Sequence, residues 1–486
     1  MSKIAVVGLD GFNPGLVKEW IDELLNLKKA EQEGIWGKMK STVPPSTFPA
    51  WTCAQTGHNP GAFGFWDSTY RDNFDYSEPK VVDSRIIKPD PLYRLLPKRG
   101  QKVAIINVPG TWPPPEVPGG YSISGLKTPR MDRGFTWPES LKKEVYSVVG
   151  EYMVDPADDE RSSLDNQEEL KLVYERDNQG FRLLKHFIQK KQCDYILAVI
   201  RGPYRMARRF YHYYDEQHRH HRPDSKDRTA LHDYYLWVDK QIGDIRGILD
   251  DETALFIHSV HGVQRLDGRV NLNEWLIHNG YMSLVEYPSA PTAFKDLNVN
   301  WSETRCWAVG DAGKIYVNRK GREPQGIVDP EDYDRLLDGL AEKIRNLPDE
   351  NGKELKTQIF KRRDIDPGPC SQYGPDLLIL FDECRWGTNE KVGYGQGNIH
   401  ALTTPDEADD VTYSLDGYFC IAGPGVPTIG EYSGATLRDL APTVLDVMGL
   451  EIPGEMEGRS LLGEEKPARP PEDEEKVRSR LKALGY

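Results

Sequence analysis

The chain has 486 residues, of which 38% are hydrophobic, and its 62 basic and 76 acidic side chains give a formal net charge of −14 at pH 7. This composition is typical of a folded globular protein, and the acidic balance excludes a broad basic face for duplex nucleic acid while leaving room for a local anion site. The sequence contains no run of about 18 apolar residues that would predict a membrane span. Its six cysteines are scattered, which favours free thiols in a reducing, cytoplasmic compartment, although their even number leaves a disulfide open.

The N-terminal segment predicts a strand followed by a helix. Residues 4–8 form an apolar run that fits a buried strand and not a signal peptide, and apolar positions over residues 16–27 predict one amphipathic helix. Asp10 comes directly after the strand. Because residues just past the carboxyl ends of parallel strands line the ligand crevice, Asp10 is a candidate for chemistry. The alternative is an ordinary turn aspartate before Gly11.

A proline-rich block at residues 41–66 precedes a short helix-like stretch. Within it, Thr47 stands just before Phe48 and Pro49, close to a predicted helix N-terminus. Backbone N–H groups at such a terminus favour an anion. By pattern alone, however, the block is only a loop.

Strands and helices alternate further along the chain. The strands are predicted at residues 102–107, 194–200 and 253–258, with a long helix at 227–250. This alternation predicts an α/β fold, in which a doubly wound, mostly parallel sheet has helices on both faces.

The segment at about 287–400 is less regular and predicts a cap inserted into the core. It contains a predicted helix near 330–347 and a strand-like run at 376–381. We therefore expect one core over residues 1–464 that includes this cap, followed by a charged C-terminal tail at 465–486.

Six segments occur along the chain in an order that resembles a known family. They are VVGLDGF, STVPPSTFPAWTCAQTGHNPG, VAIINVPGTWPPP, HGVQRLDGRVNLNEWLIHNGY, KGREPQGIV and LRDLAPTVLDVMGLEIPGEMEGRSL. Together they resemble archaeal and bacterial members of the type I phosphodiesterase and nucleotide pyrophosphatase branch of the alkaline phosphatase superfamily. The resemblance implies an alkaline-phosphatase-like fold and a metal-dependent hydrolase. In that chemistry a Thr or Ser attacks phosphorus, and two metal ions, typically zinc, assist.

The resemblance can be carried over residue by residue on the side of the nucleophile. It implies that Thr47 is the nucleophile and that Asp10, Thr47 and His261 are metal ligands. Val260 stands where the family has a metal-binding Asp, and an aliphatic side chain cannot bind a metal. Ala50 stands where this branch can place an Asn that stabilises phosphate.

The second metal set is replaced at every matched position. The family expects an Asp and a His, four residues apart, after the third strand, and Tyr204 and Arg208 stand there. The last metal-binding His is expected near residues 408–413, a stretch without histidine that ends at Tyr413. Arginine is not a zinc ligand because it stays protonated. The resemblance therefore predicts that the second metal set is missing.

Arg208 supports a further hypothesis. A fixed guanidinium, helped by Arg205 or Arg209, could occupy the space of the lost cation and hold a phosphate or sulfate bidentately. The alternative is that these arginines form ordinary salt bridges with the acidic surface. A local shift that brings in His258 or His400 would instead restore a ligand.

Two other clusters are interpreted as structural. The residues His218, His220 and His221 are more typical of a solvated loop than of a metal site, because charged residues flank them. The aromatic run at residues 210–214 is more typical of a helix packing face than of a platform for stacking bases.

Two functions remain open. The first is a phosphoester hydrolase that acts on a small anionic ester through Thr47 and holds one zinc or manganese ion through Asp10, Thr47 and His261. The second is a noncatalytic pseudoenzyme without a metal, which binds an anionic ligand or a protein partner in the old active-site crevice. The resemblance favours the first function, and the replaced residues favour the second. The sequence does not determine the substrate or the oligomeric state.

Overall fold

The computed structural model describes residues 2–77, 79–129, 134–154, 164–395, 397–402 and 411–463. The charged tail expected at 465–486 lies outside these residues. So do residues 408–410, the first part of the stretch where the family's last histidine is expected.

A large mixed sheet forms the centre of the molecule. Its strands are β1 (Lys3–Leu9), β2 (Ile35–Lys40), β5 (Val103–Val108), β6 (Tyr121–Ser124), β7 (Thr136–Trp137), β8 (Tyr195–Ile200), β9 (Thr253–His258), β19 (Asp416–Ala422), β20 (Gly430–Glu431) and β21 (Ala435–Thr436). Within the described residues the order is β20-β2-β19-β9-β1-β8-β5-β6-β7, and β21 pairs with β2. The central strands β9, β1, β8 and β5 are all parallel, whereas β19 runs antiparallel to β2 and β9. β8 is buried along its whole length because both faces of the sheet are covered.

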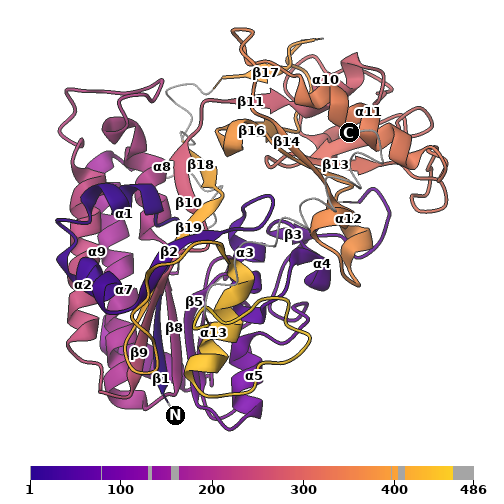
Figure 1. The fold of residues 1–486 in the computed structure, drawn as a ribbon. Coiled ribbons are helices and arrows are strands. Elements are labelled where there is room, and N and C mark those ends of the chain that lie inside the picture. Colours follow the sequence, from indigo (N-terminus) through magenta and orange to yellow (C-terminus); the bar gives the residue numbers. More distant parts are fainter. Residues whose placement is uncertain are drawn as a thin grey trace.

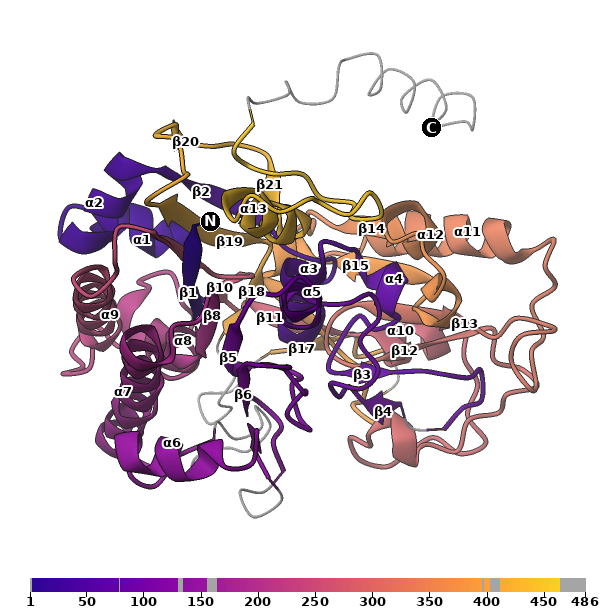
Figure 2. The same cartoon turned by 90° about the horizontal axis from the view of Figure 1, so that it is seen from below.

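Helices cover both faces of this sheet (Figures 1 and 2). On one face lie α1 (Pro14–Trp20), α2 (Leu25–Glu33), α6 (Leu141–Val149), α7 (Asn166–Lys191), α8 (Gly202–Tyr214) and α9 (Ala230–Arg246). On the other face lie α3 (Thr47–Thr56), α5 (Leu92–Lys98) and α13 (Leu440–Val447), with the short helix α4 (Pro60–Phe63) nearby. This arrangement confirms the predicted doubly wound α/β fold. None of the helices in the described part of the chain is both long and apolar enough to cross a bilayer.

The single helix predicted over residues 16–27 is wrong, because the chain forms α1 and α2 there. Asp239 on α9 is buried and caps the start of the second helix. One of its oxygens accepts from the backbone N–H of Leu27 at 2.8 Å, and the other accepts from that of Asn26 at 3.1 Å. A carboxylate at a helix N-terminus satisfies N–H groups that have no partner within the helix.

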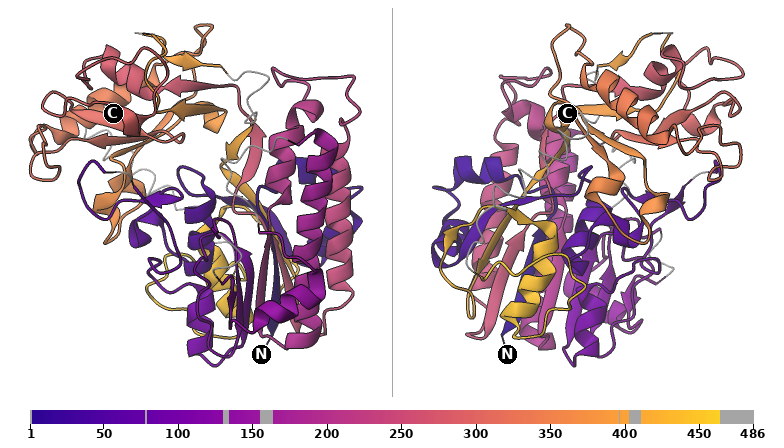
Figure 3. Two further views of the ribbon diagram at one scale, coloured as in Figure 1. Left: turned by 180° about the vertical axis from the view of Figure 1, so that it is seen from behind. Right: turned by 45° about the vertical axis from the view of Figure 1, so that its right-hand side comes forward.

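A smaller second lobe lies beyond the carboxyl edge of the central strands (Figures 1 and 3). Its elements are β11 (Gly268–Asn271), α10 (Leu272–His278), β12 (Cys306–Val309), β13 (Lys314–Val317), α11 (Tyr333–Arg345), β14 (Gln358–Lys361), α12 (Arg362–Ile365), β15 (Leu377–Leu380), β16 (Trp386–Asn389) and β17 (His400–Ala401). They form one sheet in the order β12-β13-β15-β14, a second in the order β16-β11-β17, and a hydrophobic core of their own. This lobe begins at β11, earlier in the chain than the cap expected from about 287.

The lobe is joined to the core by the chain itself and by side-chain contacts. The chain leaves the core through β10 (Gly262–Arg265) and returns through β18 (Val411–Ser414), and these two strands pair antiparallel. His261 directly precedes β10 in the chain, and Tyr413 lies within β18. The connection therefore carries two of the predicted site positions.

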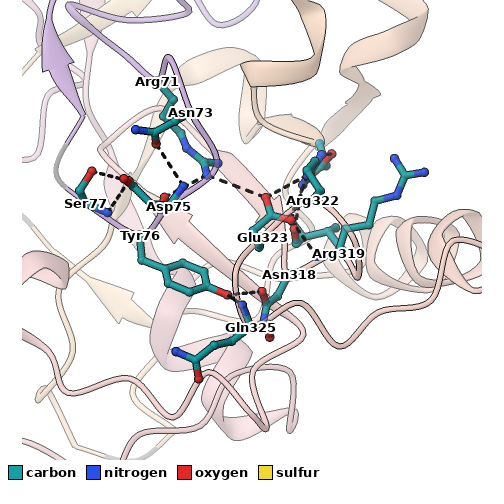
Figure 4. Close-up of polar contacts among 12 residues, drawn as sticks. Arg71, Asn73, Asp75, Tyr76, Ser77, Asn318, Arg319, Arg322, Glu323 and Gln325 are labelled. Atoms are coloured by element: carbon teal, nitrogen blue, oxygen red, sulfur yellow. Dashed lines mark hydrogen bonds and ion pairs between the residues drawn. The ribbon is translucent and has the colours of Figure 1, made fainter.

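A further contact comes from a core segment at residues 69–77 and 79–81, here called the strap, which begins at β3 (Thr69–Tyr70) and ends at β4 (Lys80–Val81). Its side chains reach the loop after β13 (Figure 4). The hydroxyl of Tyr76 donates to Asn318 at 2.6 Å, and its ring stacks on Trp301 with centroids 3.6 Å apart. The strap thus anchors the second lobe over the end of the sheet.

Candidate active site

Asp10 lies at the carboxyl end of β1, where the sequence places it, and its side chain is fully buried. One carboxylate oxygen accepts from the indole N–H of Trp51 at 3.0 Å. The other accepts from Nε of Arg201, also at 3.0 Å. Arg201 directly follows β8, and β8 is the parallel neighbour of β1 in the sheet. The carboxylate proposed as a metal ligand therefore has a guanidinium as its direct partner.

Thr47 is the first residue of α3, as its position in the proline-rich block predicts. Its side-chain oxygen lies 3.2 Å from Nε2 of His261 and 3.4 Å from the hydroxyl of Tyr413. The first N–H groups of a helix have no partner within the helix and carry a partial positive charge. An anion that reaches Thr47 would meet these groups.

His261 joins the two predicted residues. Its Nε2 lies 3.2 Å from the oxygen of Thr47 and 3.4 Å from a carboxylate oxygen of Asp10, while Nδ1 lies 3.3 Å from the carbonyl oxygen of Gly262. If Nδ1 carries the proton and donates to Gly262, Nε2 can accept the hydroxyl proton of Thr47. If Nε2 carries the proton, it donates to Asp10 or Thr47 instead. Because a neutral imidazole carries one N–H, Nε2 cannot accept a proton from Thr47 and donate one to Asp10 at the same time.

The three positions that the resemblance assigns to the second metal set meet at one wall of the site. The rings of Tyr204 on α8 and Tyr413 on β18 stack with centroids 5.4 Å apart and planes at 17°. The guanidinium of Arg208 lies over the ring of Tyr204, 5.8 Å from its centroid, and the ring of Tyr413 lies 4.4 Å from that of His261. Gly11, at φ +80°, permits this approach, because a Cβ on it would lie 2.8 Å from Cβ of Tyr204.

The other positions singled out by the sequence do not supply a ligand. Val260 is buried in the apolar cluster on the α3 side of the sheet. His258 packs against Trp51, with ring centroids 5.1 Å apart. Nε2 of His400 lies 2.8 Å from the carbonyl oxygen of Pro348 in the second lobe. Neither histidine lines the cavity at Thr47.

A cavity of about 380 Å³ separates the core from the second lobe. Thr47, Tyr204, Arg208 and Tyr413 line its core side, and Trp386 contributes to its lobe side. The charged residues in its lining are the bases Lys127, Arg208 and Arg269 and the acids Asp67 and Asp311. Among the described residues of this lining, cationic side chains outnumber acidic ones, although the chain as a whole has a net charge of −14.

The two acids of the lining are in different electrostatic states. Burial opposes ionisation of Asp67, but the ammonium of Lys314 donates to it and holds its pKa below the ordinary value. Enclosure, together with the charge of Asp67, raises the pKa of Asp311. Asp67 and Lys314 neutralise one another across the two lobes, and Asp311 is biased toward its neutral form. These two acids therefore offset less of the positive charge of the described lining than their residue types alone indicate.

The arginines beside Arg208 face elsewhere. Nε of Arg209 donates to Asn166 at 2.7 Å, and its terminal nitrogen donates to the carbonyl of Leu164 at 2.9 Å. Arg205 lines a separate cavity of about 30 Å³ next to Arg201. Neither Arg205 nor Arg209 is among the described residues that line the cavity with Arg208.

The interpretation of the histidine cluster is partly wrong. His218 is buried, because its ring packs near that of His212 on α8, and its Nδ1 accepts from the backbone N–H of His220 at 3.1 Å. Nδ1 of His221 lies 3.0 Å from the carbonyl oxygen of His212. The expected packing role of the aromatic run is confirmed, since Phe210 is fully buried in the core.

The residues at the site do not fit the two-metal set that the resemblance implies. Asp10 is already paired with Arg201, and Tyr204, Arg208 and Tyr413 form a packed wall. Across the described ranges, no three His, Cys, Asp or Glu side chains are grouped so that they could hold a metal ion. All six cysteines are free thiols.

Sequence reasoning missed Arg201. Its signal is the same as that of Asp10, a charged residue immediately after a buried strand, because Arg201 follows the apolar run of β8. The family pattern drew attention to the positions after it, where the metal ligands were expected.

His258 predicts a pH effect on stability. Burial lowers its pKa to about 3, from an ordinary value of 6.5. Since the folded protein holds this ring neutral, the unfolded chain binds the extra proton below pH 6.5, and stability is lost as the pH falls toward 3. Between pH 7 and pH 5 we expect wild type to lose about 2 kcal/mol more free energy of unfolding than His258→Leu.

Urea unfolding of both proteins at pH 7 and pH 5 measures this difference. Glu31 and Asp366, whose pKa values burial raises to about 7, act in the opposite direction over this range. They are common to both proteins and cancel in the comparison. Equal pH dependence in wild type and His258→Leu would show that His258 is not held neutral.

The doubly wound sheet, with a threonine at a helix N-terminus beside a buried Asp and His, defines an α/β protein of the alkaline phosphatase superfamily. The family model described as type I phosphodiesterase / nucleotide pyrophosphatase matches residues 4–399. The chain belongs to this family, as the six ordered segments predict.

The individual proteins that the chain resembles match it over a short segment or at low sequence identity. The chain is 34% identical over 96 residues to a 2,3-bisphosphoglycerate-independent phosphoglycerate mutase of Gloeobacter violaceus, a match that covers 20% of this chain and only 17% of that protein. Among solved structures, an inactive variant of murine ectonucleotide pyrophosphatase / phosphodiesterase 5 in complex with AMP is 12% identical, with a TM-score of 0.49. The human protein is 13% identical, with a TM-score of 0.48. Both alignments cover 93% of this chain and 96% of the other.

Proposed function

We propose that this chain binds a small phosphate ester in the cavity at Thr47 and does not carry out two-metal hydrolysis. The observation that carries the proposal is the wall formed by Tyr204, Arg208 and Tyr413. At the three positions where the family would hold its second metal, this chain has two packed phenol rings and a permanent cation. A guanidinium can bind a phosphoryl group, whereas this wall offers no carboxylate or imidazole for zinc.

Three further features support an anionic ligand. The cavity has a volume within the usual range for small-molecule sites. The first residue of α3, Thr47, faces it, so the positive end of the helix dipole adds to the charge of Arg208. Lys127 and Arg269 also line it, in a chain whose net charge is −14. The cavity is therefore a local site for anions on an acidic protein.

In this mechanism the residues bind and orient the phosphate ester and do not cleave it. Arg208 and the start of α3 hold the phosphoryl group, and the hydroxyl of Thr47 bonds to it. His261 holds that hydroxyl in place through the 3.2 Å contact. Trp386 and the other lobe residues enclose the organic part of the ester.

Hydrolysis through Thr47 is the second candidate, and the contact between Thr47 and Nε2 of His261 favours it. Nε2 would take the hydroxyl proton while a bond forms from the threonine oxygen to phosphorus and the ester P–O bond breaks. This chemistry needs Nδ1 of His261 to carry the proton and donate to Gly262. The nearby carboxylate of Asp10 favours the other tautomer, with the proton on Nε2.

Hydrolysis of bis-p-nitrophenyl phosphate tests the proposal. We expect wild type and Thr47→Ala to release p-nitrophenol at the same background rate, with or without zinc or manganese. Calorimetry with the monoester p-nitrophenyl phosphate should show saturable binding to wild type. Metal-stimulated release that Thr47→Ala abolishes would establish the hydrolase instead, and absence of binding would remove the cavity as a ligand site.

A further inference from the structure

The ion pair between Asp10 and Arg201 is almost completely buried. The side chains of Asp10 and Arg201 are 0% and 4% exposed, and Nε of Arg201 lies 3.0 Å from the carboxylate. Asp10 also accepts from the indole of Trp51 on its other oxygen. Both oxygens of this carboxylate are therefore bound by donors of the protein itself.

We propose that Arg201 is the fixed counter-ion of Asp10 and takes the place of a metal ion, so that the site holds its phosphate ester without divalent metal. The ligand in this inference rests on the proposed function. The pairing of Arg201 with Asp10, and its effect on metal binding, do not depend on that ligand.

Arginine suits this role for two reasons. Its guanidinium stays charged, and it is more weakly hydrated than an ammonium, so it is the usual base in buried ion pairs. A zinc ion would need to come within about 2.0–2.2 Å of a carboxylate oxygen and to find three or four ligands. Arg201 already approaches one oxygen of Asp10 and the indole of Trp51 approaches the other, so a zinc ion would have to displace one of these donors to bind the carboxylate.

Arg201 also contacts the wall that replaces the second metal set. Its guanidinium lies 5.4 Å from the ring centroid of Tyr204, and the guanidinium of Arg208 lies 5.8 Å from the same ring. Cations are attracted to aromatic faces at such distances. Arg201 therefore contacts Asp10 on the nucleophile's side and Tyr204 on the other, so one arginine spans both halves of the expected metal centre.

Four proteins test the inference: wild type, Arg201→Met, Asp10→Asn and the double variant. Zinc binding is measured by calorimetry after treatment with a chelator, and melting temperature is measured with and without zinc. We expect no zinc site in wild type that depends on Asp10. Arg201→Met leaves a buried carboxylate without its cation, so it should melt lower than wild type and gain zinc binding. Zinc should then raise its melting temperature by about 2 °C or more. The double variant should lose that zinc binding.

Two results would overturn the inference. One is a wild-type protein that binds about one equivalent of zinc and loses it in Asp10→Asn. This comparison needs no variant of Arg201, so it decides the matter even if Arg201→Met does not fold. The other is an Arg201→Met protein that folds but neither melts lower nor gains zinc affinity.

The affinity for p-nitrophenyl phosphate separates this inference from the proposed function. Equal affinity of wild type in chelator and in zinc supports a metal-free site, and tighter binding in zinc contradicts it. If wild type binds no ester under either condition, the proposed function fails. The zinc and melting results still decide the role of Arg201.

Discussion

Replacing Asp376 with asparagine is expected to lower the free energy of unfolding by about 3–5 kcal/mol, the usual effect of removing one partner from a buried ion pair. The side chain of Asp376 is fully buried just before β15. Arg322 donates to both of its oxygens, at 2.9 and 2.8 Å, Tyr333 donates at 2.7 Å, and the backbone N–H of Val317 donates at 2.7 Å. Burial alone would raise the pKa of Asp376, but these bonds hold it below its ordinary value.

Urea unfolding followed by tryptophan fluorescence measures this effect, because Trp301 and Trp307 lie in the same lobe. Asp334→Asn is the matched control. Asp334 pairs with Arg363 at 2.8 Å, but both side chains are about half exposed, so we expect a loss of about 1 kcal/mol or less. Equal losses of unfolding free energy in the two variants would show that burial does not determine how much the Asp376 network stabilises the protein.

This network also matters for the cavity. Asp376 bonds to the end of β13 and directly precedes β15, and Ile379 and Leu380 of β15 line the cavity. Asp376→Asn is therefore expected to weaken binding of p-nitrophenyl phosphate even where most of the protein remains folded. The lobe stabilises the cavity through its own core rather than through direct contact of Asp376 with the ligand.

The sequence predicted the core strands well because their signal is local. The apolar run at residues 253–258 becomes β9 with the same bounds, and the position of Asp10 after a strand follows from the same run of apolar residues at the N-terminus. Thr47 is a partial success, because the pattern alone indicated a loop near a helix N-terminus and the structure places this residue at the start of α3. These predictions needed no knowledge of which strands are neighbours.

The contacts that define the site could not be predicted, because they join distant parts of the chain. Asp10 and Arg201 are 191 residues apart, and they meet only because β1 and β8 are neighbours in the sheet. Thr47 and Tyr413 are 366 residues apart. The cap at the start of α2 also comes from a residue of α9. Composition gives the sign of the net charge, but it does not show where basic side chains gather.

The family resemblance did not predict how the residues at the replaced positions pack. It placed Tyr204, Arg208 and Tyr413 at positions of lost function, and it described each replacement as a missing ligand. The structure shows that these three side chains contact one another or a shared neighbour, with Tyr204 between Arg208 and Tyr413. That these side chains pack into one wall depends on geometry that a motif does not contain.

Arg208→Ala is expected to weaken binding of p-nitrophenyl phosphate by about 10- to 100-fold, the cost of losing a charge-assisted hydrogen bond. Calorimetry on the folded variant measures this loss. Arg209→Ala is the control, because Arg209 is adjacent in the chain but bonds to Asn166 and Leu164 outside the cavity, and we expect its affinity to match wild type. Arg208→Lys keeps the charge but not the planar, bidentate donor, so its affinity should fall between that of Arg208→Ala and that of wild type. Unchanged affinity in Arg208→Ala would mean that the start of α3 and Lys127 hold the anion without this arginine.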